Sequence, residues 1–253
     1  MPNEPSRFQA PEGRAGSLSH DGPRFTAQAA TSDGLAFRRP PLDLLRCVAT
    51  GKSEDIALDV YCSPQFLLRE FFWLRLRLMV LLIRAMGGHG TSVLDFGGGS
   101  GIFAMSLASG FERVTLIDQN TTEAEHLNAH YGLPNLNIVR ADILGHDFGE
   151  GVFDAVVAAD VLEHFLDVDA PITRIHRWLK PDGLLFTSLP TENLWYRILR
   201  VMFRKQKPQD HYHTAAEVER RLATLGFRKA RGIYHPFVLP LFPLFRISAW
   251  RKA

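Results

Sequence analysis

The sequence is poor in cysteine, with Cys47 and Cys62 the only two among 253 residues. Two isolated thiols cannot form a disulfide framework, and no C-x-x-C pair is present to bind a structural metal. The first residues also lack the apolar core of a secretory signal peptide. These absences predict a protein of a reducing, cytoplasmic compartment.

The chain has no strong excess of either charge overall, with a formal net charge of +2. This balance hides an asymmetry, because residues 1–193 carry 16 basic and 24 acidic side chains while residues 194–253 carry 13 and 3. Hydrophobic residues make up 46% and charged residues 22%, which is ordinary for one globular core with accessory elements. The basic C-terminal part predicts an anionic surface or substrate on that side.

The most informative stretch is a cluster of glycines at positions 97, 98, 99 and 101. A short apolar run, residues 92–96, precedes the cluster, and a periodic apolar segment follows it. This order predicts a buried strand, a tight turn and a helix beginning near Gly101. Glycine lets the backbone approach a ligand, and the free N–H groups of a helix N-terminus point at the same place. The stretch therefore predicts the nucleotide-binding corner of a doubly wound α/β sheet.

The glycine spacing distinguishes two kinds of nucleotide-binding corner. The dinucleotide fingerprint G-x-G-x-x-G fails here, because Ile102 stands where the last glycine is needed after Gly97 and Gly99. An NAD-dependent oxidoreductase is therefore weakened and stays as an alternative. Asp95 and the three glycines at 97, 99 and 101 instead resemble the acidic-x-G-x-G-x-G motif of class I S-adenosylmethionine (SAM) dependent methyltransferases.

Two later segments share this resemblance. The run F-D-A-V-V at 153–157 and D-V-L-E-H at 160–164 is similar to the segment after the fourth strand in small-molecule methyltransferases of the quinone-biosynthesis type, the methyltransferase type 11/12 branch. Residues 179–187 resemble the L-K-P-G-G turn into their fifth strand, with Asp182 in place of the first glycine. The resemblance implies a mostly parallel, seven-stranded Rossmann-like sheet of order 3-2-1-4-5-7-6, with the last strand antiparallel.

An acid ends the next apolar run, residues 113–118, 17 positions beyond Gly101. A carboxylate at that strand end can accept hydrogen bonds from both ribose hydroxyls of an adenosine, so Asp118 is predicted to bind the cofactor. The resemblance places Asp142 near the adenine amino group, Ile143 on the adenine ring, and the turn after the fourth strand beside both adenine and acceptor. The expected SAM-binding residues are Asp95, Phe96, Gly97, Gly98, Gly99, Gly101, Asp118, Gln119, Asp142, Ile143, Asp160 and Val161.

The rest of the chain divides by composition. Residues 1–40 hold few large apolar side chains, which predicts a disordered segment. Residues 41–89 are predicted to form an N-terminal helical cap, and residues 90–253 the SAM-binding domain with an insertion at 189–213. Within that insertion, residues 195–203 show helical spacing and basic side chains.

Few side chains are placed to act as a general base. His164 follows the fourth strand, and His211 precedes the last predicted helix, so both are candidate catalytic residues. His211 and His213 alone do not complete a metal site, and no metal is expected. The segment after the fourth strand lacks the (N/D)-P-P-(Y/F/W) motif of nucleic-acid amine methyltransferases, and no cysteine follows Cys62. Both departures favour a small-molecule acceptor over nucleic acid.

The apolar stretch 64–86 carries several arginines. Arg75 and Arg77 would lie at the middle of a bilayer, where each costs roughly 2.5–3.5 kcal/mol, so a spanning helix is disfavoured. We expect a helix that packs on the sheet or covers the cofactor. The alternative is peripheral membrane contact through residues 64–86 and the basic residues 195–207, which would suit an apolar or anionic, lipid-linked acceptor. A non-catalytic SAM-binding accessory protein at a membrane surface stays as a further alternative.

Overall fold

Seven strands pair into one sheet of order β3-β2-β1-β4-β5-β7-β6 in a computed structural model, which describes residues 34–49, 56–87, 90–191, 211–236 and 243–253. The first five strands pair in parallel, and β7 runs antiparallel to β5 and β6. The predicted strand order and antiparallel last strand are confirmed. The strands are β1 (Ser92–Phe96), β2 (Arg113–Asp118), β3 (Leu136–Arg140), β4 (Phe153–Ala159), β5 (Leu179–Pro190), β6 (Phe227–His235) and β7 (Phe245–Lys252).

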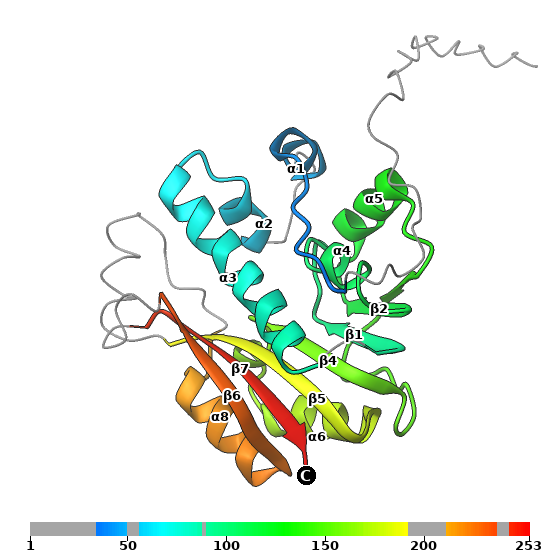
Figure 1. Cartoon of the computed structure of the whole chain (residues 1–253), viewed down its shortest axis with the longest axis vertical. Helices are drawn as coiled ribbons and strands as arrows, with labels where there is room; N and C mark the ends of the chain where they lie inside the picture. The colour runs from blue at the N-terminus through cyan, green and yellow to red at the C-terminus, as the bar shows by residue number, and fades with distance from the viewer. Residues whose placement is uncertain (1–33, 50–55, 88–89, 192–210, 237–242) are drawn as a thin grey trace, which may run out of the picture.

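Helices cover both faces of this sheet (Figure 1). They are α1 (Leu42–Ala49), α2 (Ile56–Tyr61), α3 (Phe66–Ala85), α4 (Ala104–Leu107), α5 (Thr122–Tyr131), the 3-10 helix η1 (Leu162–His164), α6 (Asp169–Trp178) and α8 (Ala215–Thr224). The first three helices, with α4 and α5, pack over one face, and α6 and α8 pack over the other. Alternating side chains divide the core accordingly: Val93 belongs to the first cluster and Leu94 to the second.

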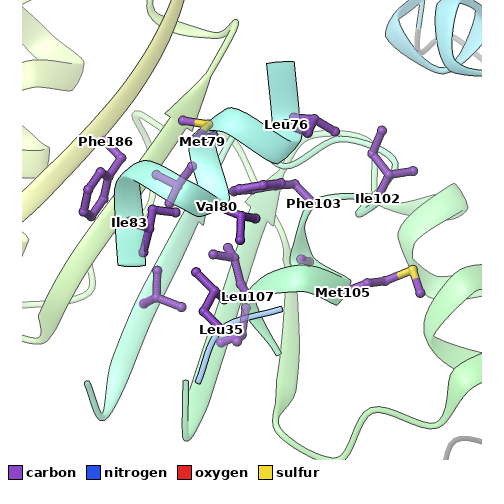
Figure 2. Packing of buried hydrophobic residues seen from close by; sticks show 14 of the residues in the cluster. Leu35, Leu76, Met79, Val80, Ile83, Ile102, Phe103, Met105, Leu107 and Phe186 are labelled. Carbon is purple, nitrogen blue, oxygen red and sulfur yellow. The ribbon is translucent and has the colours of Figure 1, made fainter. Parts of the chain in front are cut away.

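The long helix α3 packs across the sheet rather than standing apart from it. Its residues Leu76, Met79, Val80 and Ile83 are at most 2% exposed and contact the segment after the glycine cluster and Phe186 of β5 (Figure 2). The expectation that residues 64–86 form a helix packed on the sheet is confirmed. Within the described parts of the chain, none of the helices is both long and apolar enough for a membrane crossing.

Two boundaries differ from the sequence expectations. The helix expected from Gly101 begins only at Ala104, because Gly101 has φ +75° and its N–H donates to the carbonyl of Gly98 at 2.9 Å. Residues 34–40 are ordered rather than disordered. Leu35 is 2% exposed, and the N–H of Ala36 donates to Ser109 Oγ at 2.9 Å, so one apolar anchor and backbone hydrogen bonds hold the segment.

Other predictions lie on residues outside the described ranges. These are the predicted disorder of residues 1–33 and the predicted basic helix at 195–203. Of the predicted insertion 189–213, the first residues extend β5, and residues 211–213 lead into α8. The helix α8 begins with the predicted capping box, in which Thr214 accepts from the N–H of Glu217 and the Glu217 carboxylate accepts from the N–H of Thr214.

Candidate cofactor site

The glycine cluster forms a loop at the carboxyl end of β1. The N–H of Gly97 donates to the carbonyl of Ile117 in β2 at 2.9 Å, which ties the start of the loop to the neighbouring strand. Gly97 has φ +68°, and a Cβ built on it would lie 2.3 Å from Cγ2 of Val161. A side chain is therefore excluded both by backbone conformation and by the turn after β4. This close approach brings the ends of β1 and β4 together at the switch point of the sheet.

Asp118 ends β2 directly beside this loop. Its Oδ2 accepts from the N–H of Gly99 at 2.9 Å, and its Oδ1 accepts from the N–H of Asn120 at 2.9 Å. The carboxylate predicted to bind ribose thus also fixes the position of the glycine loop. Gly99 itself has φ +47°, so the loop presents its backbone at that point without a side chain.

Asp95 lies beneath the loop and is only 2% exposed. Its Oδ2 has no hydrogen-bond partner among the described residues. Burial, together with the negative charge of Asp118, raises the pKa of Asp95 to about 7. A buried carboxylate oxygen without a donor is costly, so this position is suited to a bound cation or N–H group.

The other predicted cofactor residues fall at the same edge of the sheet, with two qualifications. Gln119 follows β2, and its Nε2 donates to Oδ1 of Asp142, which follows β3, at 3.4 Å. The side chain of Phe96 is fully buried in the cluster under α6, so any contact of Phe96 with the cofactor would be made by its backbone. Ile143 is 6% exposed and packs in the same cluster.

Asp160, a predicted cofactor residue, is paired with Arg75, which the sequence reasoning did not place at this site. It follows β4 with φ +54°, and its carboxylate is paired with the guanidinium of Arg75 from α3. Ser188 of β5 donates to the same carboxylate at 3.2 Å. The available signal in the sequence was Arg75 itself, because it lies on the apolar side of the helix, apart from the helix's other charged residues.

The two candidate bases lie together after the end of β4. The rings of His164 and His211 are 4.7 Å apart and nearly perpendicular. The N–H of Tyr212 donates to the carbonyl of Glu163 at 2.9 Å, which joins the segment before α8 to η1. His213, considered with His211 in the sequence, instead contacts the carbonyl of Leu166 at 3.1 Å.

A metal ion could be held at a place that the sequence did not suggest. Glu163, His164 and His211 each offer one ligand atom, and these atoms lie within 4.8 Å of one another. Glu163 is 1% exposed, while the two histidines are half-buried. Imidazole rings can also serve as proton acceptors, with or without an ion.

The residues present fit an adenosyl sulfonium cofactor. The unpartnered Oδ2 of Asp95 matches an ammonium group, and the loop around Gly97 and Gly99 has no side chain to block approach. Asp118 stands at the strand end where ribose hydroxyls are bound in this type of sheet. The sheet order, the loop and these acids together define the fold and site of a class I SAM-dependent methyltransferase.

Comparison with known proteins finds the same kind of domain. Residues 94–187 match the family model described as a methyltransferase domain. A probable SAM-dependent methyltransferase of Mycolicibacterium smegmatis is 28% identical over 177 residues, covering 67% of this chain and 65% of the relative. The chain therefore contains a domain similar to those of class I SAM-dependent methyltransferases.

One further protein is similar to the chain in sequence, and one solved structure is similar to it in fold. A ubiquinone biosynthesis O-methyltransferase of Methylocella silvestris is 37% identical over 102 residues, covering 40% of each protein. The magnesium protoporphyrin IX methyltransferase of Synechocystis, solved with bound S-adenosylhomocysteine, has the same fold, with TM-score 0.59, 19% identity, and coverage of 83% of this chain and 94% of that one. The chain spans less than two thirds of the length of the Mycolicibacterium and Methylocella relatives.

Proposed function

We propose that this protein transfers the methyl group of SAM to a small, apolar acceptor. The observation that carries the proposal is the pair of acids around the glycine loop: Asp118, bound to the N–H of Gly99, and the buried Asp95 with its unpartnered oxygen. A dinucleotide has no need of a buried carboxylate at that place, whereas the amino group of SAM supplies its missing partner.

Different residues of the chain would hold different parts of the cofactor. Asp118 would accept from the ribose hydroxyls, Asp95 would hold the amino group, and Asp142 with Gln119 would face the adenine. SAM supplies a sulfonium methyl group that is already activated, so the protein's main work is in-line alignment of the acceptor. Where the acceptor is a hydroxyl, we propose that His164 or His211 accepts its proton, because both rings lie beyond the end of β4.

The acceptor class is suggested by the relatives and by the absent motifs. The printed names of two relatives concern ubiquinone and magnesium protoporphyrin, both small molecules with large apolar parts. The sequence after β4 lacks the motif of nucleic-acid amine methyltransferases, and Asp160-Val161-Leu162 stands there instead. An apolar metabolite is therefore favoured as acceptor over a nucleic acid.

Calorimetric titration of the full chain with SAM, S-adenosylhomocysteine and NAD⁺ tests this function. We expect micromolar binding of the first two and none of NAD⁺, because the glycine spacing and Asp95 suit an aminoacyl sulfonium and not a pyrophosphate. Tight NAD⁺ binding without SAM binding would restore the oxidoreductase alternative. Methyl transfer from labelled SAM to an extract of apolar metabolites then separates an enzyme from a SAM-binding accessory protein.

We further propose that the protein works in the cytoplasm and contacts anionic membranes through the outer side of α3. Leu67, Leu74 and Leu81 are spaced by seven residues, which places them on one side of the helix, and are 77%, 40% and 48% exposed. Arg77 and Arg84 are exposed on the same side. An apolar stripe edged by arginines suits the interface of an anionic bilayer, where an apolar acceptor would be dissolved.

Sedimentation with vesicles tests the membrane proposal. Wild-type protein should sediment with phosphatidylcholine vesicles that contain phosphatidylglycerol, and Leu67→Gln/Leu74→Gln/Leu81→Gln should bind at least about tenfold more weakly, because each buried leucine contributes about 1.5–3 kcal/mol. Leu166→Gln is the matched control, since Leu166 is equally exposed at 76% and lies away from α3. Equal sedimentation of the triple variant and wild type would contradict the proposal.

A further inference from the structure

Arg75 is a buried cation at the middle of α3. It is 3% exposed, and its guanidinium carbon lies 5.6 Å from the ring centre of Phe72 and 5.0 Å from that of Phe245. Burial of an arginine among aromatic rings is unfavourable unless its charge and donors are satisfied. Its partners therefore explain why an arginine occupies a position on the packed side of an apolar helix.

Those partners come from three separate elements. The Nη1 group is paired with the Asp160 carboxylate and donates to Oγ of Ser188 at 3.1 Å. The Nη2 group donates to the hydroxyl of Tyr61 in α2. One side chain thus joins α2 and α3 to the ends of β4 and β5.

Asp160 connects this cluster to the cofactor loop. It is a non-glycine residue with φ +54°, a conformation that costs free energy unless its surroundings hold it. Its N–H donates to the carbonyl of Ser188 at 2.9 Å. The next residue, Val161, packs tightly against Gly97. A Cβ built on Gly97 would lie 2.3 Å from Cγ2 of Val161. The path from Arg75 to the glycine loop therefore passes through only two residues.

We propose that Arg75 is a positioning residue: it holds Asp160 in its left-handed conformation and so couples the packing of α2 and α3 to the SAM-binding loop. Without the guanidinium, the Asp160 carboxylate loses its ionic partner, and the turn that presses Val161 onto Gly97 relaxes. The coupling is reciprocal, so SAM bound at the loop stabilises the packing of α3. This inference rests on the proposed function, because it takes the loop to be the SAM site.

A second arginine pair provides an internal contrast. Arg39 forms a two-pronged ion pair with Glu70, also on α3, at 2.7 and 2.8 Å, but both side chains are 34% exposed. This pair joins the segment before α1 to α3 and touches no residue at the ends of β1 or β4. Arg39→Met therefore removes the same group from the same helix interface without reaching the loop, and it serves as the matched control.

Calorimetry with SAM on a double-mutant cycle tests the positioning role. Arg75→Met and Asp160→Asn should each weaken SAM binding at least about tenfold, and the double variant should bind no more weakly than Asp160→Asn alone, because Arg75 acts through Asp160. Arg75→Lys should recover part of the affinity, and Arg39→Met should bind as wild type does. The double variant leaves no unpaired buried charge, so it keeps the test valid if Arg75→Met folds poorly.

Hydrogen exchange gives a readout that packing alone would not change. Adding SAM should slow amide exchange in residues 66–85 of the wild type and of Arg39→Met, should slow it less in Arg75→Lys, and should leave it unchanged in the double variant. SAM affinity of Arg75→Met equal to wild type, additive losses in the cycle, or no SAM-dependent protection of α3 in the wild type would each overturn the inference. Failure of the wild type to bind SAM at all would instead overturn the proposed function.

Discussion

Asp118→Ala should lower the affinity for SAM by at least about 100-fold. The substitution removes the acceptor for the ribose hydroxyls and also the acceptor for the N–H groups of Gly99 and Asn120. A hydrogen bond to a charged group contributes about 1.5–3 kcal/mol, so the loss of two such bonds accounts for roughly two orders of magnitude. The loop itself is released, which makes the loss larger than that expected from the ligand contacts alone.

Asp118→Asn separates the two roles of this residue. The amide keeps one oxygen acceptor but loses the negative charge, so we expect an affinity between those of wild type and Asp118→Ala. Calorimetric titration with SAM measures both variants, and circular dichroism confirms that each is folded. If Asp118→Ala binds SAM with an affinity within about threefold of wild type, the Asp118 carboxylate does not belong to the SAM site.

Asp95→Asn should have opposite effects on stability and on SAM affinity. The pKa of Asp95 is raised to about 7 by burial and by the charge of Asp118. Between its unfolded value and about 7, the folded protein holds a proton that the unfolded chain releases, so the free energy of unfolding falls as pH rises through this range. The neutral amide avoids the cost of ionising a buried group at pH 8, and the variant should melt several degrees higher there.

The same amide cannot form an ion pair with the amino group of SAM. Affinity of Asp95→Asn for SAM should therefore fall at least tenfold at pH 8, where the wild-type carboxylate is ionised, and by less at pH 6. Thermal denaturation and calorimetry at these two pH values measure both effects. Unchanged affinity together with lower stability at pH 8 would show that Asp95 serves packing and does not face the cofactor.

Local spacing predicted the cofactor loop, because a strand, a glycine turn and an acid at the next strand end are encoded within residues 92–118. The sheet order was implied by resemblance, because periodicity does not reveal which strands pair. The glycine motif does not reveal which side each strand residue faces: neighbouring strand residues face opposite sides, and the Phe96 side chain packs in the core beneath α6.

Features that depend on distant residues could not be predicted. Arg75 and Asp160 are 85 positions apart, and nothing in a helical apolar stretch states which strand end its single buried charge will reach. The pairing of His164 with His211, and the anchoring of Leu35 in a segment of low apolar content, arise in the same way from the folded arrangement. Burial and long-range pairing decide these contacts.

A crystal structure of the full chain with S-adenosylhomocysteine tests the central claim most directly. The account predicts that the ribose hydroxyls lie within hydrogen-bond distance of Asp118, that the amino group meets the buried carboxylate of Asp95, and that the ligand backbone runs along Gly97 and Gly99. A ligand bound elsewhere, or a glycine loop that stays closed on itself with Asp118 directed away at saturating ligand, would contradict it.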